Sequence, residues 1–311
     1  MAFFKIPGLA VGTAAAGIYC MIQNRQLCMT EYEIVFEKLP SVFSGKKILQ
    51  LSDLHTKKYG DNYDNLINSC KTADPDYIFF TGDLYSRNEV NLDHKLVLMK
   101  RLRTIAPVYY VFGNHEADTP EKAEVLAIKL EQCGINVLRN KKIRLYSGEE
   151  YINVYGADIE SKYYKNSKIK RMAANVRICT DIESKYYENS KGSYSNLPQL
   201  TVEKLDRMLG ESDKYHFNIL LAHTPFPFIN YAKWGADLIF SGHCHGGVIR
   251  IPKIGGLLSP ERKFLPEYTK GVYANDKNEN SAKMVVSAGL GKFRLQNPSE
   301  IILVTLRSKD N

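Results

Sequence analysis

Short apolar runs alternate with longer amphipathic stretches along most of the chain from about residue 31 onward. The short runs are typical of buried strands, whereas the amphipathic stretches repeat with a helical period. We expect strands at residues 47–52, 76–81, 107–112, 217–222 and 237–241, and later ones near residues 151–155, 248–251, 284–287 and 301–306. We expect helices at residues 62–72, 92–103, 120–133 and 202–209. This alternation predicts a layered α/β or α+β enzyme fold.

The amino-terminal residues break the alternation. Residues 6–24 carry no charged side chain over roughly the length that crosses a bilayer, with Lys5 before them and Arg25 after them. The length favours a single-pass anchor in the cell membrane within residues 1–30; the alternatives are a signal peptide cleaved near residues 14–16 and a lipoprotein signal ending at Cys20. The flanking charges favour a remainder of the chain that lies outside the cytoplasm, and cleavage would make it a secreted protein.

A tandem repeat is the second irregularity. Residues 158–168 (DIESKYYKNSK) recur at residues 181–191 (DIESKYYENSK), with Lys165 replaced by Glu188. Two copies are too few for a solenoid, and extra length in a surface loop has a small entropic cost. We therefore expect a duplicated surface insert at residues 158–198, either a lid over a site or a solvated insert without chemistry. We assign it no catalytic residue.

Composition narrows the class of protein only slightly. The 311 residues are 44% hydrophobic and 24% charged, which excludes wholesale disorder and a polytopic membrane protein. Apart from the terminal segment, this length suits one large domain at residues 31–311. The net charge of +8 is spread along the chain and selects no anionic partner. The six cysteines are scattered without a CxxC pair, so we expect free thiols.

Candidate chemistry is concentrated where the predicted strands end. Five strands are followed by polar groups that suit metal ligation: Asp53 and His55; Asp83; Asn114, His115 and Glu116; His223; and His243 and His245. Five of the seven histidines occupy such positions, whereas His94 and His216 do not and are expected to be structural. Ligands collect at the carboxyl edge of an open sheet, and clustered Asp, Asn and His suit a pair of divalent metals.

The order D-x-H, G-D, G-N-H-E, H and G-H-x-H resembles that of the calcineurin-like metallophosphoesterase superfamily. The likeness runs from about Lys47 to the carboxyl terminus and is strongest to a bacterial subgroup with an amino-terminal membrane segment. The subgroup is indicated by residues 51–55 (LSDLH), 242–247 (GHCHGG), 250–252 (RIP) and 289–291 (GLG), followed by Arg294 and residues 297–301 (NPSEI). The resemblance implies a four-layer αββα sandwich, which is an α+β fold.

The same resemblance implies a dinuclear metal centre and a role for each motif residue. One metal would be held by Asp53, His55, Asp83 and His245, and the other by Asp83, Asn114, His223 and His243. Asp83 would bridge the two ions, and His115 would stabilise or protonate the leaving oxygen. A metal-bridging hydroxide would attack the phosphorus, because two cations lower the pKa of a shared water and clamp the phosphoryl oxygens. Imidazole-rich ligation favours manganese, iron or zinc, with magnesium and nickel as further options.

Three positions depart from the common pattern of the family. Many members have an acidic residue three positions after the bridging aspartate, where it orients the catalytic histidine; here that position is Ser86, and Glu116 or Glu89 could replace it. Cys244 stands where threonine is common, and its thiol either is sensitive to oxidation beside the metals or points into the core. Val248 replaces a frequent glutamine. None of these changes removes a metal ligand.

The sequence supports one leading function and two alternatives. The leading one is a metal-dependent phosphatase or phosphodiesterase, acting on a small or lipid-linked envelope phosphoester near the membrane. The alternatives are a nuclease and a non-catalytic, membrane-tethered metal-binding module. A nuclease would need a clustered basic strip, whereas residues 141–144 and 168–171 are only short basic runs, so we expect no specific nucleic-acid partner.

Overall fold

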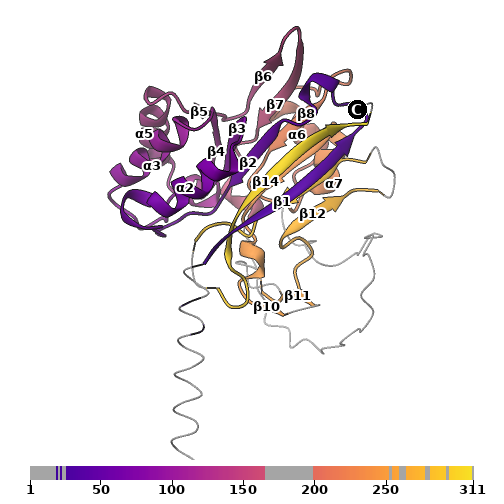
Figure 1. Ribbon diagram of the computed structural model, residues 1–311. Coiled ribbons are helices and arrows are strands. Elements are labelled where there is room, and N and C mark those ends of the chain that lie inside the picture. The colour runs from indigo at the N-terminus through magenta and orange to yellow at the C-terminus, as the bar shows by residue number, and fades with distance from the viewer. Residues whose placement is uncertain are drawn as a thin grey trace, which may run out of the picture.

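The computed structural model describes residues 26–164, 199–251, 254–258, 264–276, 281–291 and 294–309, together with Tyr19 and Ile22. Two six-stranded mixed sheets lie face to face, with helices on both outer faces (Figure 1).

The first sheet has its longest strands at one edge and a parallel centre. Its order is β1 (Leu27–Phe36), β14 (Ser299–Ser308), β2 (Lys47–Leu51), β3 (Tyr77–Thr81), β4 (Val108–Val111) and β5 (Asn136–Val137). Strands β2 to β5 run parallel, β14 is antiparallel to β2, and β1 is parallel to β14. The covering helices are α2 (Asp64–Ala73), α3 (Asp93–Arg103) and α5 (Pro120–Gln132).

The second sheet repeats this plan with antiparallel edges. Its order is β12 (Gly271–Ala274), β13 (Lys283–Val286), β9 (Leu238–Ser241), β8 (Asn218–Leu221), β7 (Glu150–Gly156) and β6 (Lys141–Ser147). The four central strands are parallel. Helices α6 (Val202–Leu209) and α7 (Phe228–Trp234) cover its outer face.

Shorter elements connect the strands and helices of both sheets. They are α4 (Asn114–Ala117), η1 (Ser41–Phe43), η2 (Asp61–Tyr63), η3 (Ser161–Tyr163), η4 (His245–Gly247) and the hairpin of β10 (Arg250–Ile251) and β11 (Gly255–Gly256).

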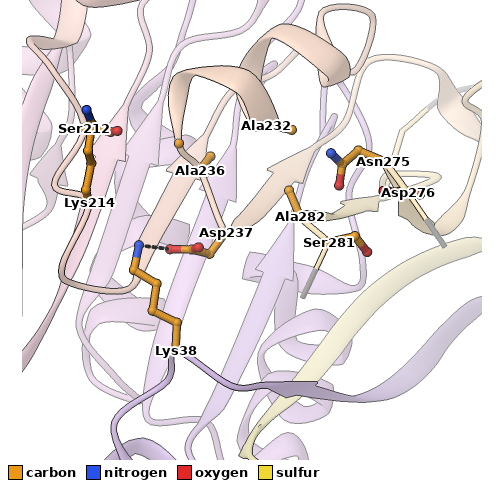
Figure 2. Close-up of a pocket in the computed structure, with 11 residues that line it drawn as sticks. Lys38, Ser212, Lys214, Ala232, Ala236, Asp237, Asn275, Asp276, Ser281 and Ala282 are labelled. Carbon is orange, nitrogen blue, oxygen red and sulfur yellow. Dashed lines mark hydrogen bonds and ion pairs between the residues drawn. The ribbon is translucent and has the colours of Figure 1, made fainter. Parts of the chain in front are cut away.

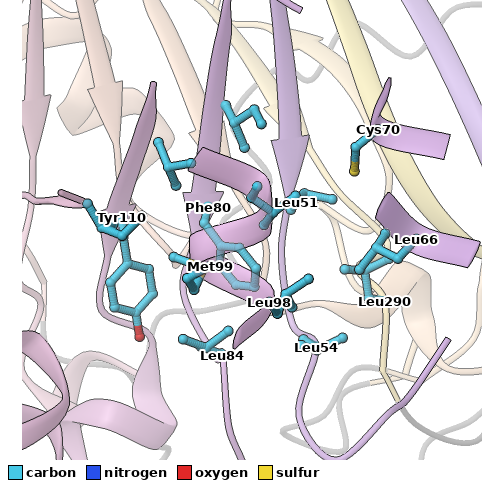
Figure 3. Close-up of a cluster of buried hydrophobic side chains, with 14 of the residues drawn as sticks. Leu51, Leu54, Leu66, Cys70, Phe80, Leu84, Leu98, Met99, Tyr110 and Leu290 are labelled. Atoms are coloured by element: carbon cyan, nitrogen blue, oxygen red, sulfur yellow. The ribbon is translucent and has the colours of Figure 1, made fainter. Parts of the chain in front are cut away.

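Three buried apolar layers hold the sandwich together. The middle layer joins the two sheets, where the rings of Phe79 and Phe240 meet edge-on at 5.3 Å. A second layer packs the first sheet against its helices, and it includes Phe80 of β3 and Leu98 of α3 (Figure 3). The third packs the second sheet against α6 and α7. Because the apolar side chains divide into these layers, the predicted four-layer αββα sandwich of the α+β class is confirmed.

The predicted strands and helices are present with boundaries shifted by at most two residues, and α6 matches its predicted bounds at both ends. Strand β1 begins at Leu27, so the sheet starts before residue 31, where the sequence analysis placed the start of the domain. In this edge strand the inward-facing Tyr32, Ile34 and Phe36 alternate with exposed residues, a two-residue period that was not assigned to a strand in the sequence analysis. Strands β6 and β12 and helix α7 were also not predicted.

Two predicted segments lie largely outside the described residues. The proposed anchor at residues 6–24 is described only at Tyr19 and Ile22, and the duplicated insert only at residues 158–164. No helix in the described part of the chain is long and apolar enough to cross a bilayer.

Candidate metal centre

The predicted ligands meet at one edge of the sandwich, because β2, β3, β4, β8 and β9 all end there. All seven are buried: Asp53, His55, Asp83, Asn114, His223, His243 and His245. Four of them form one group, in which one ligand atom from each of Asp53, His55, Asp83 and His245 lies within 4.8 Å of the others. The strand ends of both sheets therefore contribute to a single cluster.

A second group adjoins the first through Asp83. The side-chain oxygen Oδ1 of Asn114 lies 2.8 Å from Nδ1 of His243 and 3.2 Å from Nε2 of His223. Oδ2 of Asp83 lies 3.5 Å from Nε2 of His223 and 3.7 Å from Nε2 of His55. The Asp83 carboxylate thus stands between the two groups of donor atoms.

The backbone at this edge adopts conformations that most residues avoid. Five of the predicted ligands have φ between 51° and 69°: Asp53, His55, Asp83, His243 and His245. Non-glycine residues adopt positive φ only in a few per cent of cases, and such strain persists where the surrounding structure holds it. Gly113 allows the close approach, since a Cβ on it would lie 2.3 Å from Oδ1 of Asp83. The fold therefore constrains these side chains at an energetic cost.

Hydrogen bonds from neighbouring strand ends orient the carboxylates and one imidazole. Asp53 accepts from Oγ of Ser52 at 2.6 Å and from the backbone N–H of His243 at 3.2 Å. Asp83 accepts from the backbone N–H of His115 at 2.8 Å. Nδ1 of His223 lies 2.6 Å from the carbonyl oxygen of Thr81, which leaves Nε2 to face the cluster. Contacts of this kind select the tautomer of a metal-binding histidine.

Burial and mutual contact shift the pKa values of the clustered groups. Burial would raise the pKa of Asp83, but His223, His55 and His115 outweigh it and lower that pKa well below its usual range. For His223, burial would lower the pKa, yet Asp83 and Asp53 raise it to about 10. Burial is the main reason that the pKa of His55 falls well below its ordinary value. The Asp83 carboxylate therefore remains ionised and attracts positive charge.

The donor atoms fit divalent cations better than they fit one another. Nε2 of His55 lies 3.3 Å from Nε2 of His245, and Oδ1 of Asn114 faces imidazole nitrogens. If the Asn114 amide were turned around, its nitrogen would donate to these atoms and its oxygen would accept from Arg87 at 2.7 Å. With the oxygen facing inward, carboxylate, amide and imidazole lone pairs converge, which is the ligand chemistry of borderline divalent metals.

The two carboxylates proposed as substitutes at the Ser86 position have other partners. Glu116 is buried and accepts from the backbone N–H groups of Gly113 at 2.8 Å and Asp83 at 2.9 Å. Burial, with Asp83 next, raises the pKa of Glu116 to about 7. Glu89 accepts from the backbone N–H of Ser86 at 3.1 Å and lies 2.9 Å from His94. Glu116 therefore holds the backbone of Asp83 and Gly113 in place.

Arg87 is the residue against His115 that sequence reasoning missed. Its Nη1 lies 3.0 Å from Nε2 of His115, and its backbone N–H lies 3.3 Å from Nδ1 of that ring. Arg87 is itself bound through Nε to Asp118. The only sequence signal for this contact is that Arg87 directly follows Ser86, the position where many family members have an acidic residue.

The remaining predicted residues have structural positions. Cys244 is buried and in no disulfide, and Arg294 is buried with Nε donating to the carbonyl of Gly291 at 2.7 Å and Nη1 to that of His245 at 3.3 Å. Arg294 thus supports the turn that carries a predicted ligand. His216 lies away from the cluster, 2.8 Å from Asp213, in agreement with a structural role.

A cavity of about 440 Å³ lies at the opposite end of the second sheet (Figure 2). It is lined by Lys38 and Asp237, which form an ion pair at 3.0 Å, and by Asn275 among others. Asp237 precedes β9, whereas His243 follows that strand. The cavity is therefore separate from the metal-ligand cluster.

The sandwich and its buried Asp, Asn and His cluster define a metal-dependent hydrolase of the phosphoesterase class. A family comparison specifies this class: the model of the calcineurin-like phosphoesterases matches residues 46–247, and the chain belongs to that family. Members of the family use divalent metals and hydrolyse phosphoester bonds, so the protein is a metallophosphoesterase.

Similar proteins match this chain over most of their length. YkuE of Bacillus subtilis, an uncharacterized metallophosphoesterase, is 28% identical over 96% of this chain and 94% of its own. An uncharacterized metallophosphoesterase of Aquifex aeolicus is 25% identical over 95% of this chain and 97% of its own. LpxG of Chlamydia trachomatis, a UDP-2,3-diacylglucosamine pyrophosphatase, is 23% identical over 86% of each chain.

Proposed function

We propose that the protein is a phosphoester hydrolase with a dinuclear metal centre. Asp53, His55, Asp83 and His245 would hold one divalent ion. Asn114, His223 and His243 would hold the second, together with the bridging Asp83. The observation that carries this proposal is the position of Oδ2 of Asp83, 3.7 Å from His55 and 3.5 Å from His223, between two groups of lone-pair donors.

The protein's own residues would prepare the reaction around that centre. Bound divalent ions would supply Lewis acidity and an activated water. Thr81 holds His223 in the tautomer that presents Nε2, and Glu116 holds the backbone of Asp83. His115, with the Arg87 guanidinium 3.0 Å away, would stabilise the leaving oxygen. Manganese, iron or zinc suits this imidazole-rich donor set.

We propose a lipid-linked or small envelope phosphoester as the substrate class. The similarity to LpxG, which acts on a diacylated nucleotide sugar, supports it. The uncharged segment at residues 6–24 also supports it, because an anchor there would hold the catalytic domain at the outer surface of the membrane.

Metal analysis coupled to hydrolysis tests the function on the full chain. We expect two manganese ions per chain and turnover of p-nitrophenyl phosphate, bis(p-nitrophenyl) phosphate or a diacylated nucleotide sugar. His223→Ala should abolish turnover, whereas the matched variant His216→Ala should not. A metal-loaded chain inert toward all three substrates would contradict the enzymatic function, and equal turnover by both variants would contradict the ligand assignment.

A further inference from the structure

The first copy of the repeated segment contacts the candidate site through a chain of side chains. The hydroxyl of Ser161 in η3 donates to Oδ1 of Asp118, whose Oδ2 accepts from Nε of Arg87. Nη1 of the same guanidinium lies 3.0 Å from Nε2 of His115. Since a guanidinium cannot accept hydrogen bonds, its planar group is fixed on one side by Asp118 and on the other by the imidazole. Three side chains thus connect the repeat to the residue proposed to face the leaving group.

Tyr164 provides a second contact from the same copy. The residue is 2% exposed, and the centroid of its ring lies 5.0 Å from that of His243 and 5.7 Å from that of His223. The hydroxyl makes no hydrogen bond to a residue in the described ranges. The aromatic ring is therefore the part of Tyr164 that bears on the two histidines.

We propose that residues 158–164 are a positioning segment of the active site, and that the first copy of the repeat performs this role. Ser161 would orient His115 through Asp118 and Arg87. The guanidinium donates to the imidazole, whereas an acidic residue at position 86 would accept from it, so the contact fixes the ring in a different way. Tyr164 would hold the rings of His223 and His243 in place. This inference rests on the phosphoester hydrolase function proposed above.

The second copy supplies matched controls, because residues 181–187 repeat residues 158–164 without change. We expect Ser161→Ala to lower kcat about tenfold, because residues that support metal ligands from outside have effects of this size. Ser161→Thr keeps a hydroxyl and should have the kcat of the unmodified chain. The loss should be larger for phenyl phosphate than for p-nitrophenyl phosphate, since a poorer leaving group needs more stabilisation. Ser184→Ala should stay within about twofold of the unmodified chain.

Equal losses for Ser161→Ala and Ser184→Ala would overturn the assignment to the first copy. A loss that is the same for both leaving groups would overturn the action through His115, because a general loss of folded protein affects both substrates alike.

Tyr164 is tested without substrate, by titrating the metal-free full chain with Mn²⁺ and recording the paramagnetic resonance spectrum. We expect Tyr164→Leu to lower the affinity for one of the two Mn²⁺ ions about tenfold. Tyr164→Phe should bind both ions with the affinity of the unmodified chain. Tyr187→Leu is the control and should also leave binding unchanged. Normal Mn²⁺ affinity in Tyr164→Leu, or weakened affinity in Tyr164→Phe, would overturn the role of the ring.

This binding measurement separates the two proposals. If the unmodified chain binds two Mn²⁺ ions but hydrolyses no phosphoester, the proposed function is wrong, while the binding results still decide the role of Tyr164.

Discussion

The two ends of the central parallel strands hold aspartates in opposite electrostatic surroundings. At the amino ends, Asp76 accepts from Nζ of Lys46 at 2.7 Å and Asp237 from Nζ of Lys38 at 3.0 Å. Each also accepts from a backbone N–H of an adjacent strand residue. At the carboxyl ends, Asp53 and Asp83 are buried and pair, within the described part of the chain, with histidines rather than with lysine or arginine.

This difference shows which carboxylates the protein neutralises with its own cations. An ionised carboxylate is costly to bury unless a partner compensates its charge. Lysines do so at the amino ends, where the aspartates only brace the strands. At the carboxyl ends the neighbours are imidazoles, and the raised pKa of His223 shows that these carboxylates favour a positive charge beside them. Because an imidazole that releases its proton becomes a metal ligand, a divalent cation can take the place of that proton. The same residue type thus has a structural role at one end and a proposed catalytic role at the other.

The largest expected effect comes from removing one carboxylate at each end. Asp83→Asn should lower kcat at least about 1000-fold, because the proposed bridge between two cations loses its charge. Asp237→Asn should have a kcat within about twofold of that of the unmodified chain. Hydrolysis of bis(p-nitrophenyl) phosphate by the manganese-loaded chains measures both. If Asp83→Asn kept a tenth of the activity or more, the proposed bridge would be wrong.

A methyl group added beside the cluster should have the next largest effect. In Gly113→Ala the new Cβ would lie 2.3 Å from Oδ1 of Asp83, so we expect at least a tenfold loss of kcat/KM and weaker manganese binding. Gly210→Ala is the control, because no atom of the described residues, apart from its chain neighbours, lies within 4 Å of the added Cβ, and only its positive φ is strained. It should lower stability by about 1 kcal/mol and leave kcat/KM unchanged.

Metal removal should lower the stability of the folded chain through the cluster at the carboxyl ends of the strands, and not through the ion pairs at their amino ends. Manganese at 100 times its Kd would stabilise the folded state by about 2.7 kcal/mol per site, so chelation should lower the denaturation temperature by several degrees. Lys38→Met should keep this response, and Asp83→Asn should lose most of it. An equal response in all three chains, measured by scanning calorimetry, would place the bound metal elsewhere.

The smallest effect is expected at the compensated end. Lys38 and Asp237 form a partly exposed pair, so Lys38→Met should reduce the free energy of unfolding by about 1 kcal/mol or less. Urea denaturation measures this change, and kcat should not change. A fall in kcat to below half would mean that this end of the strands is coupled to the site.

The strands that could be predicted from the sequence are those with a strong local pattern of apolar residues. The buried central strands β2, β3, β4, β8 and β9 are short apolar runs, and each precedes a polar residue where the chain turns. The edge strands β1 and β12 are half exposed, so their inward and outward positions alternate and form no continuous apolar run. Central strands are therefore readable from local sequence, whereas edge strands depend on which neighbour they pair with.

The candidate ligands were predictable for the same local reason, but their supporting contacts were not. Asp53, Asp83 and His223 each follow a recognisable strand. Arg87 and Tyr164 reach the cluster from a loop and from the first repeat copy, and their local sequence does not specify where those two segments pack.

The sequence by itself determined a layered fold of alternating strands and helices with polar residues at the strand ends, because strand periodicity and strand-end chemistry are local properties. The family resemblance of its motifs implied the αββα sandwich and the seven metal ligands. Only the tertiary structure decided that Asp83 stands between two donor groups, that Glu116 braces its backbone, and that the first repeat copy contacts His115 through Asp118 and Arg87. Those relations join residues that are distant along the chain, and only packing of the two sheets sets the distances between them.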